Sequence, residues 1–144
     1  MSEQENIRLA EQQIALLNAR DLDRYLQRID ESYVGESEIT PEPVRGPSGV
    51  RRMLDMVFAA FPDVHLEPEE IIASGNHVVS RIRITATHQG NYLGIPATNR
   101  RVSWRACNVV ELRDGKAIRG RLYADNASLL QQLGAISLPQ AASA

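Results

Sequence analysis

The order of the predicted elements in this 144-residue chain is that of an α+β fold. Apolar residues recur at helical spacing in three segments before Pro62, whereas the segments after Val64 show the two-residue alternation of strands. Tight turn signals such as Asp114-Gly115 separate those strands. We therefore expect N-terminal helices packed on a curved, mostly antiparallel sheet, with a pocket enclosed between the sheet and the helices.

Two helices and a short strand are expected in the first forty residues. Over residues 3–19 the apolar side chains have the spacing of one buried helix face: Ile7, Ala10, Ile14 and Leu17. Asp21 fits the N-cap of a second, short helix. Its inward face consists of Leu22, Tyr25, Leu26 and Ile29. A strand over residues 33–39 follows, and the segment TPEPVRGP after it is too rich in proline and glycine to be either element.

For the remainder of the chain the sequence predicts one helix, four strands and a last short helix. The third helix begins at Pro47, whose missing N–H costs nothing in a first turn, and ends before Pro62. The strands are expected over residues 64–73, 77–88, 100–112 and 116–124. A helix over 126–133 stops at Gly134. We expect a single domain over residues 1–144, with a core over about 5–134 and a flexible tail over 135–144.

Composition argues against several classes of function. The net charge is −2, with acids and bases mixed along the chain, so nothing indicates nucleic-acid binding. No apolar run is long enough to cross a bilayer, and no signal-peptide pattern is present, so contact with membranes is not expected. The single cysteine, Cys107, excludes an internal disulfide and is typical of a reducing compartment, which predicts a cytoplasmic protein.

The stretch ATHQGNYLGIPATNRRV, over residues 86–102, is expected to place candidate functional groups at one end of the sheet. It reads as a strand end, a turn-rich loop that carries Tyr92, and the start of the next strand. Strand alternation puts His88 on the core side, at the end of its strand. Asp125 follows the last strand as a lone carboxylate, which is a candidate catalytic group for chemistry that needs neither a metal nor a cofactor.

Alternation also sorts the side chains of the last two strands. Trp104 and Asn108 share one face of the strand over 100–112 and are candidates to line one cavity, although a tryptophan is also a common core residue. On the last strand, one face is mainly polar: Arg119, Arg121, Tyr123 and Asp125. The other is mainly apolar: Ile118, Gly120, Leu122 and Ala124. Alternation leaves open whether the polar face points into the cavity or into solvent.

Four segments together resemble the SnoaL-like polyketide cyclase family, a branch of the nuclear-transport-factor-2-like superfamily. They occur in the family's order and spacing over about residues 18–134: Ala60-Phe61-Pro62-Asp63, residues 87–102, Asp114-Gly115-Lys116, and Asp125 with LLQQLG at 129–134. The resemblance implies a cone-shaped α+β barrel with a hydrophobic cavity. It also implies a homodimer that uses no cofactor.

The resemblance further implies that Asp125 matches the family's catalytic aspartate. In the cyclases this residue is a general base toward a carbon acid and returns the proton to the new alkoxide, while the cavity holds the flexible chain in the geometry that closes the ring. Asn108 stands at or near a position where family members carry a histidine. An asparagine can donate a hydrogen bond to an enolate oxygen but cannot shuttle a proton. Residues 96–99, Pro-Ala-Thr-Asn, replace the family's Pro-Pro-Thr-Gly.

These considerations give one leading hypothesis and several alternatives. The leading one is ring closure in a small apolar substrate with carbonyl groups, such as a polyketide, with Asp125, Asn108 and His88 as catalytic candidates. The candidate substrate-binding residues are Tyr123, Arg121, Trp104, Tyr33, Phe61 and Tyr92. An epoxide-hydrolase-like or hydratase-like reaction would need a second carboxylate, for which Glu111 is the nearest candidate. An accessory hydroxylase that works with a reductase, and a non-catalytic binding domain, remain open.

Overall fold

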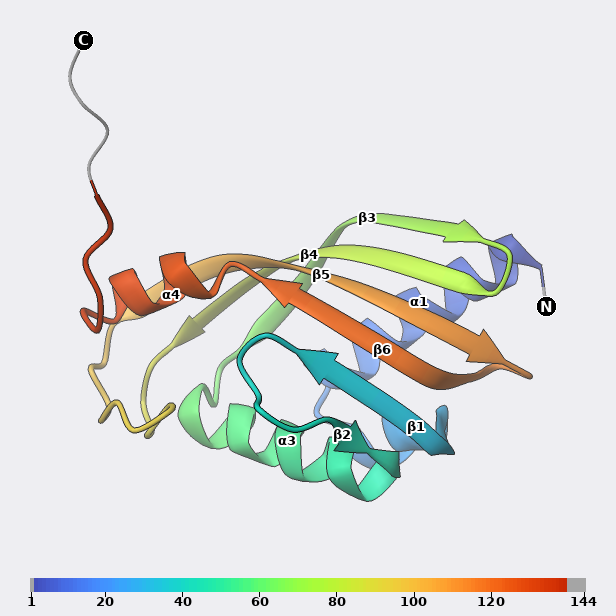
Figure 1. The fold of residues 1–144 in the computed structure, drawn as a ribbon, viewed down its shortest axis with the longest axis horizontal. Helices are drawn as coiled ribbons and strands as arrows, with labels where there is room; N and C mark the ends of the chain where they lie inside the picture. Colours follow the sequence, from blue (N-terminus) through green and yellow to red (C-terminus); the bar gives the residue numbers. More distant parts are fainter. Residues whose placement is uncertain (1, 140–144) are drawn as a thin grey trace, which may run out of the picture.

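The computed structural model describes residues 2–139 and confirms the α+β class (Figure 1). The helices are α1 (Glu3–Asn18), α2 (Leu22–Leu26), α3 (Gly46–Ala60) and α4 (Asn126–Gln132). The strands are β1 (Ile29–Ser37), β2 (Val44–Arg45), β3 (His65–Ser74), β4 (His77–Thr87), β5 (Arg101–Arg113) and β6 (Lys116–Ala124). The last five residues of the predicted flexible tail lie outside the described part of the chain.

The six strands form one open, curved sheet in the order β2-β1-β6-β5-β4-β3. All neighbouring pairs are antiparallel except β1 and β6, which are parallel. Helix α1 packs against β3 and β4, and α3 packs against β1 and β2. Both helices cover the same side of the sheet (Figure 1). We call this side the cavity face and the opposite side the outer face.

Local sequence accounts for the helix ends and the tight turns. Asp21 caps α2, as predicted, because its carboxylate accepts a hydrogen bond from the backbone N–H of Arg24 at 3.3 Å. Asp114 and Gly115 both adopt the left-handed backbone conformation, with φ of 52° and 74°. They connect the paired residues Arg113 and Lys116, which confirms the predicted two-residue hairpin.

Two predictions for the segment between α1 and α3 were wrong. Ile29, expected on the second helix, begins β1 instead, because the backbone N–H of Ala117 donates to the carbonyl of Arg28 and draws the chain into the sheet. The proline-rich segment, expected to form no regular element, contains β2. Its residues Val44 and Arg45 pair with β1, so a sheet edge was available to them that the local sequence does not reveal.

Candidate functional site

A cavity of about 1340 Å³ lies between the cavity face of the sheet and helices α1 and α3. Two hydrophobic clusters flank it. One is formed by α1, α2, the first half of α3 and the adjoining strand ends, and the other surrounds Phe61 where α3 ends. Most of the lining side chains are apolar, among them Leu54, Val57, Ile82 and Ala106. A large apolar cavity with a few polar groups is the usual form of a site for an organic ligand.

The cavity face of β4 and β5 carries two polar side chains opposite each other. Ser80 pairs with Asn108 in the ladder between these strands, and both line the cavity. No side-chain hydrogen bond to another described residue satisfies either group. Trp104 lies farther along the same face of β5 and also lines the cavity, as alternation predicted. Asn108 and Ser80 are thus free to bind the polar atoms of a ligand.

Two tyrosines at the β1 side of the cavity add further polar groups to its lining. Tyr25 on α2 and Tyr33 on β1 both contribute to the cavity. Burial raises the pKa of Tyr25 far above its ordinary value, and the neighbouring Tyr33 adds to this effect. Burial likewise raises the pKa of Tyr33. Both phenols therefore stay protonated at neutral pH and can donate a hydrogen bond.

Phe61 organises the end of the cavity nearest the loop between β4 and β5. Its ring lies 5.1 Å from the Tyr92 ring and 5.5 Å from those of Trp104 and His88, measured between centroids. Phe61, Tyr92 and Trp104 all line the cavity. The structure thus brings these three predicted binding residues together as an aromatic cluster, onto which a flat ligand can stack.

His88 lies behind this aromatic cluster and does not line the cavity. It is fully buried, and its ring Nδ1 accepts a hydrogen bond from the backbone N–H of Thr98 at 3.2 Å. The Thr98 hydroxyl is 2.9 Å from the same nitrogen. The backbone of His88 also bonds to Asn99 and Arg100 on the far side of the loop. These contacts hold the loop closed, so the geometry gives His88 a structural role.

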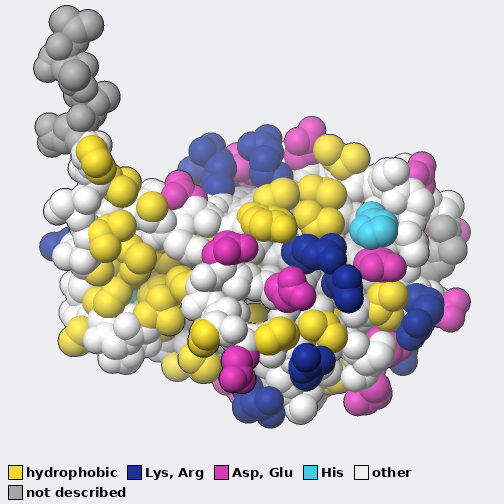
Figure 2. Space-filling model, viewed as in Figure 1, with side chains coloured by type: hydrophobic (Ala, Val, Ile, Leu, Met, Phe, Trp, Pro, Cys, Tyr) yellow, Lys and Arg dark blue, Asp and Glu magenta, His cyan; other side chains and the backbone are white. Residues whose placement is uncertain are grey.

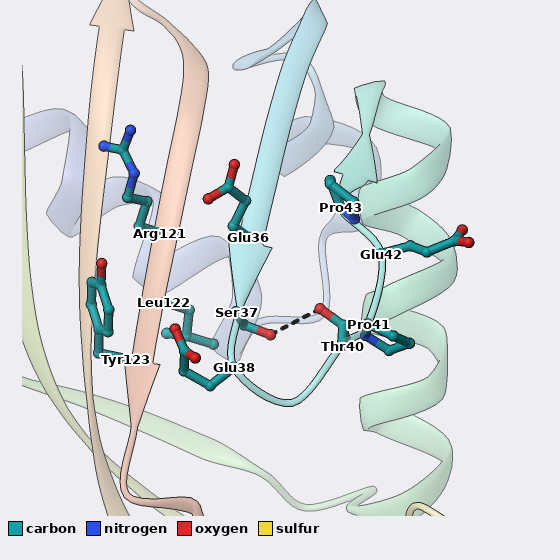
Figure 3. Close-up of a pocket in the computed structure, with 10 residues that line it drawn as sticks. All are labelled: Glu36, Ser37, Glu38, Thr40, Pro41, Glu42, Pro43, Arg121, Leu122 and Tyr123. Carbon is teal, nitrogen blue, oxygen red and sulfur yellow. Dashed lines mark hydrogen bonds between the residues drawn. The ribbon is translucent and has the colours of Figure 1, made fainter.

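Arg121 and Tyr123 point away from the cavity, so the expectation that they bind substrate there has no geometric support. Leu122 and Ala124 line the cavity instead. Tyr123 is 52% exposed. Both Arg121 and Tyr123 border a smaller hollow of about 230 Å³ near the end of β1, which Figure 3 shows. The apolar face of β6 completes the cavity lining, and the guanidinium and phenol on the other face keep their contact with water.

Asp125 lies where β6 ends and α4 begins, and it is not itself among the residues that line the cavity. It is the N-cap of α4, and its Oδ1 accepts a hydrogen bond from the backbone N–H of Ser128 at 3.0 Å. Its neighbours Ala124 and Asn126 line the cavity, whereas its own side chain is exposed. Within residues 2–139 no ion pair ties Asp125 to Arg121, so its second carboxylate oxygen is available.

The two-carboxylate arrangement of an epoxide hydrolase is not assembled in the cavity. Glu111 lies on the outer face of β5, with its carboxylate 3.9 Å from the Nε2 of His77. Its ladder partner is Arg119, one strand over on β6. This placement follows from strand alternation, which puts Glu111 and Asn108 on opposite faces of β5. Glu111 therefore cannot serve as the second acid of the hydrolase-like alternative in this cavity.

Within the described residues, no three side chains of His, Cys, Asp or Glu come together as a metal site. Nor does any described helix have the length and apolar character needed to cross a membrane. Sequence reasoning missed Ser80 and Tyr25 as cavity groups. Ser80 could have been found, because it is a polar residue on the otherwise apolar face that also carries Val78 and Ile82.

Comparison with known proteins gives a consistent set of relatives. A family model described as SnoaL-like polyketide cyclase matches residues 7–133. The aklanonic acid methyl ester cyclase DnrD of Streptomyces peucetius is 33% identical over 101 residues, which cover 69% of each chain. The nogalonic acid methyl ester cyclase of Streptomyces nogalater is 28% identical over 115 residues, or 79% of this chain and 84% of that one.

Solved structures agree with these relatives in fold. The structure of AclR from Streptomyces galilaeus, a protein proposed to be a hydroxylase, superimposes with a TM-score of 0.85 at 30% identity. The match covers 94% of this chain and all of the other. The same fold thus carries proteins for which different reactions are named.

Proposed function

The chain belongs to the SnoaL-like polyketide cyclase family, and we propose that it closes a ring in a polyketide ester by a cofactor-independent intramolecular aldol reaction. The observation that carries this proposal is the cavity of about 1340 Å³, whose walls are mostly apolar and carry hydrogen-bonding groups at several places. Such a cavity suits a flat, oxygenated, partly cyclised ligand. The names of two relatives, both methyl ester cyclases, support the substrate class.

Ring closure needs a base, a way to hold the chain folded, and a donor for the developing oxyanion. The base removes a proton from a carbon activated by adjacent carbonyl groups. The carbanion attacks a carbonyl carbon of the same molecule, a carbon–carbon bond forms, and the alkoxide takes a proton. Substrate and product are isomers. An apolar cavity that accepts only a folded substrate supplies the proximity that makes this step fast.

We assign the general base to Asp125 and the oxyanion donor to Asn108. Asp125 is supported by its position between Ala124 and Asn126, which both line the cavity, and by a carboxylate oxygen that the α4 cap leaves free. Asn108 is supported by its place on the cavity face, where its amide has no partner among the described residues. A side-chain N–H aimed at a developing oxyanion lowers the barrier by electrostatic stabilisation.

Replacement of Asp125 by asparagine tests the base directly. Asparagine caps helices as well as aspartate does, so Asp125→Asn removes the carboxylate's basicity and keeps the α4 cap. We expect turnover of aklanonic acid methyl ester to fall by at least about 100-fold, the usual worth of a positioned general base. Asp21→Asn is the matched control, since Asp21 caps α2 in the same way, and it should keep full turnover. Unchanged turnover in Asp125→Asn would rule out this role.

A second candidate function is hydroxylation, which the similarity to AclR favours at 30% identity over nearly the whole chain. A hydroxylase adds an oxygen atom to its substrate and consumes an oxidant, whereas aldol closure leaves the molecular mass unchanged. Product mass therefore separates the two candidates.

We also propose that the protein forms a homodimer through the outer face of the sheet. Exposed apolar side chains lie there, including Ile72 at 53% and Tyr123 at 52%. Figure 2 shows hydrophobic groups interspersed with charged ones on this side of the molecule. Light scattering coupled to gel filtration should give the mass of two chains, and Ile72→Lys should give one. A monomeric wild-type protein would contradict the proposal.

A further inference from the structure

Two glycines on neighbouring strands leave room for the side chain of Tyr33. Gly35 on β1 and Gly120 on β6 are paired in the sheet. A Cβ atom added to Gly35 would lie 2.8 Å from the Tyr33 hydroxyl, and one added to Gly120 would overlap that hydroxyl. Neither glycine has the positive φ that would require glycine for the backbone alone. Glycine inside a strand marks a close approach, and here the approaching group is the phenol.

The glycines determine where the Tyr33 hydroxyl lies. The ring extends over the Gly35–Gly120 pair instead of rising from the sheet, which brings the hydroxyl above β6 at the surface of the cavity. No hydrogen bond joins this hydroxyl to another group in the described residues. The hydroxyl of this half-buried tyrosine is therefore free to donate a hydrogen bond to a ligand in the cavity.

The strand register places this hydroxyl near Asn108, whose own ladder partner is Ser80 on the next strand. Gly120 is two residues from Leu122 on β6, and Leu122 pairs with Asn108. Residues two apart on a strand are about 6.6 Å apart, and adjacent strands are about 4.8 Å apart. The positions beneath the phenol hydroxyl and Asn108 are therefore diagonal neighbours, at a separation of about 8 Å. Oxygen atoms on different rings of one fused-ring ligand lie at comparable separations.

We propose that Tyr33, held over Gly35 and Gly120, donates a hydrogen bond to a ring oxygen of a fused-ring polyketide and thereby selects oxygenated ligands over hydrocarbon ones. The inference rests on the proposed function, because it takes the substrate class from it. It adds Tyr33 as a residue that determines specificity. It also explains why Gly35 and Gly120 are glycines, since both make room for the Tyr33 ring. Asn108 and Ser80 bind a second oxygen of the same ligand, which fixes how the ligand lies along the sheet.

Binding can be measured without turnover, because Trp104 is the only tryptophan and lines the cavity. Quenching of its fluorescence reports occupancy by a dihydroxyanthraquinone or by anthracene, which has the same three-ring skeleton without oxygen. Tyr33→Phe removes only the hydroxyl. We expect it to weaken quinone binding by about 3- to 10-fold and to leave anthracene binding unchanged. Tyr123→Phe, on the outer face, is the matched control and should change neither.

A second set of variants tests the two glycines. Gly120→Ala should weaken quinone binding when Tyr33 is present and have no further effect in a Tyr33→Ala background, because the overlap is then gone. Equal losses for quinone and anthracene in Tyr33→Phe would overturn the proposal, as would failure of the wild type to bind the quinone. A protein that binds the quinone in this Tyr33-dependent way but turns over no ester would refute the proposed function and leave this inference standing.

Discussion

Ser80 and Asn108 face each other across β4 and β5, on the cavity side of the sheet and among apolar neighbours. Neither side chain has a hydrogen-bond partner among the described residues. A ligand with matching oxygen atoms can therefore bind to both of them. The pair therefore marks the part of the cavity where ligand orientation is decided.

Asn108→Leu should reduce ring closure strongly, since it keeps the side-chain volume and removes the amide donor. We expect kcat to fall by on the order of 100-fold, the typical loss when one oxyanion donor is removed. Steady-state kinetics with the methyl ester measures this. Val109→Leu, on the outer face of the same strand, serves as the control. If Asn108→Leu raises KM alone, the amide binds substrate without stabilising the oxyanion.

Ala106→Phe should block the cavity. Ala106 is 4% exposed and lines the cavity between Asn108 and Trp104 on β5. A phenyl group fits into the existing space, so we expect a folded protein that binds ligand at least about 10-fold more weakly. Trp104 fluorescence and the melting temperature together measure the effect. Full turnover by a folded Ala106→Phe variant would mean that the chemistry happens elsewhere.

Asp63 should make the folded state more stable at neutral pH than in acid. Burial opposes the shift, but hydrogen bonds from the Thr87 backbone and hydroxyl, with the charge of Arg101, lower the pKa of Asp63 below its ordinary value of 3.8. A depressed folded-state pKa stabilises the protein above the unfolded pKa, and this stabilisation is lost as pH falls through the folded value.

Asp63→Asn should therefore be destabilised at pH 7 by about 1 kcal/mol, a modest amount because the carboxylate is partly exposed. The difference from the wild type should shrink at the acid end of a denaturation series. A destabilisation that stays constant across the series would show that charge is not involved.

Thr98→Val should loosen the loop that covers the aromatic end of the cavity. The variant removes the hydroxyl beside Nδ1 of the buried His88 and leaves only the backbone N–H as its partner. The Thr98 hydroxyl also accepts a hydrogen bond from the backbone N–H of Arg100 at 3.3 Å, so the variant removes two contacts of the loop. We expect the free energy of unfolding to fall by about 1 to 2 kcal/mol, since one such hydrogen bond is worth about 1 kcal/mol. Thr85→Val on β4 is the control, since no side-chain hydrogen bond of Thr85 is found in the described region. Equal stability of the two variants would contradict the structural role of His88.

Sequence patterns predicted the turns and the faces of the strands, because these features depend on residues that are close in the sequence. The Asp114-Gly115 hairpin follows from two residues that tolerate left-handed backbone. The common cavity placement of Trp104 and Asn108 follows from the two-residue period of a strand. The conformation of Ile29 could not be predicted this way. Its apolar spacing continues a helix, and only the distant bond from Ala117 to Arg28 determines that it is a strand residue.

The side chains of β6 show the limit of sequence reasoning at the site. Alternation separates Arg121 and Tyr123 from Leu122 but cannot say which set faces the helices. The register with β5 decides it, because Leu122 pairs with the cavity-facing Asn108. Asp125 lies just past the strand end, where alternation no longer applies. Its position depends on how α4 begins.

The product formed from aklanonic acid methyl ester by the purified protein, without added cofactor, tests the central claim most directly. Mass spectrometry and proton NMR of the product measure its mass and its new carbon–carbon bond. Aldol closure predicts a product of the same mass with one ring more than the substrate, formed by the wild type and not by Asp125→Asn. A product heavier by one oxygen atom or one water molecule would contradict this account, as would an unchanged ester.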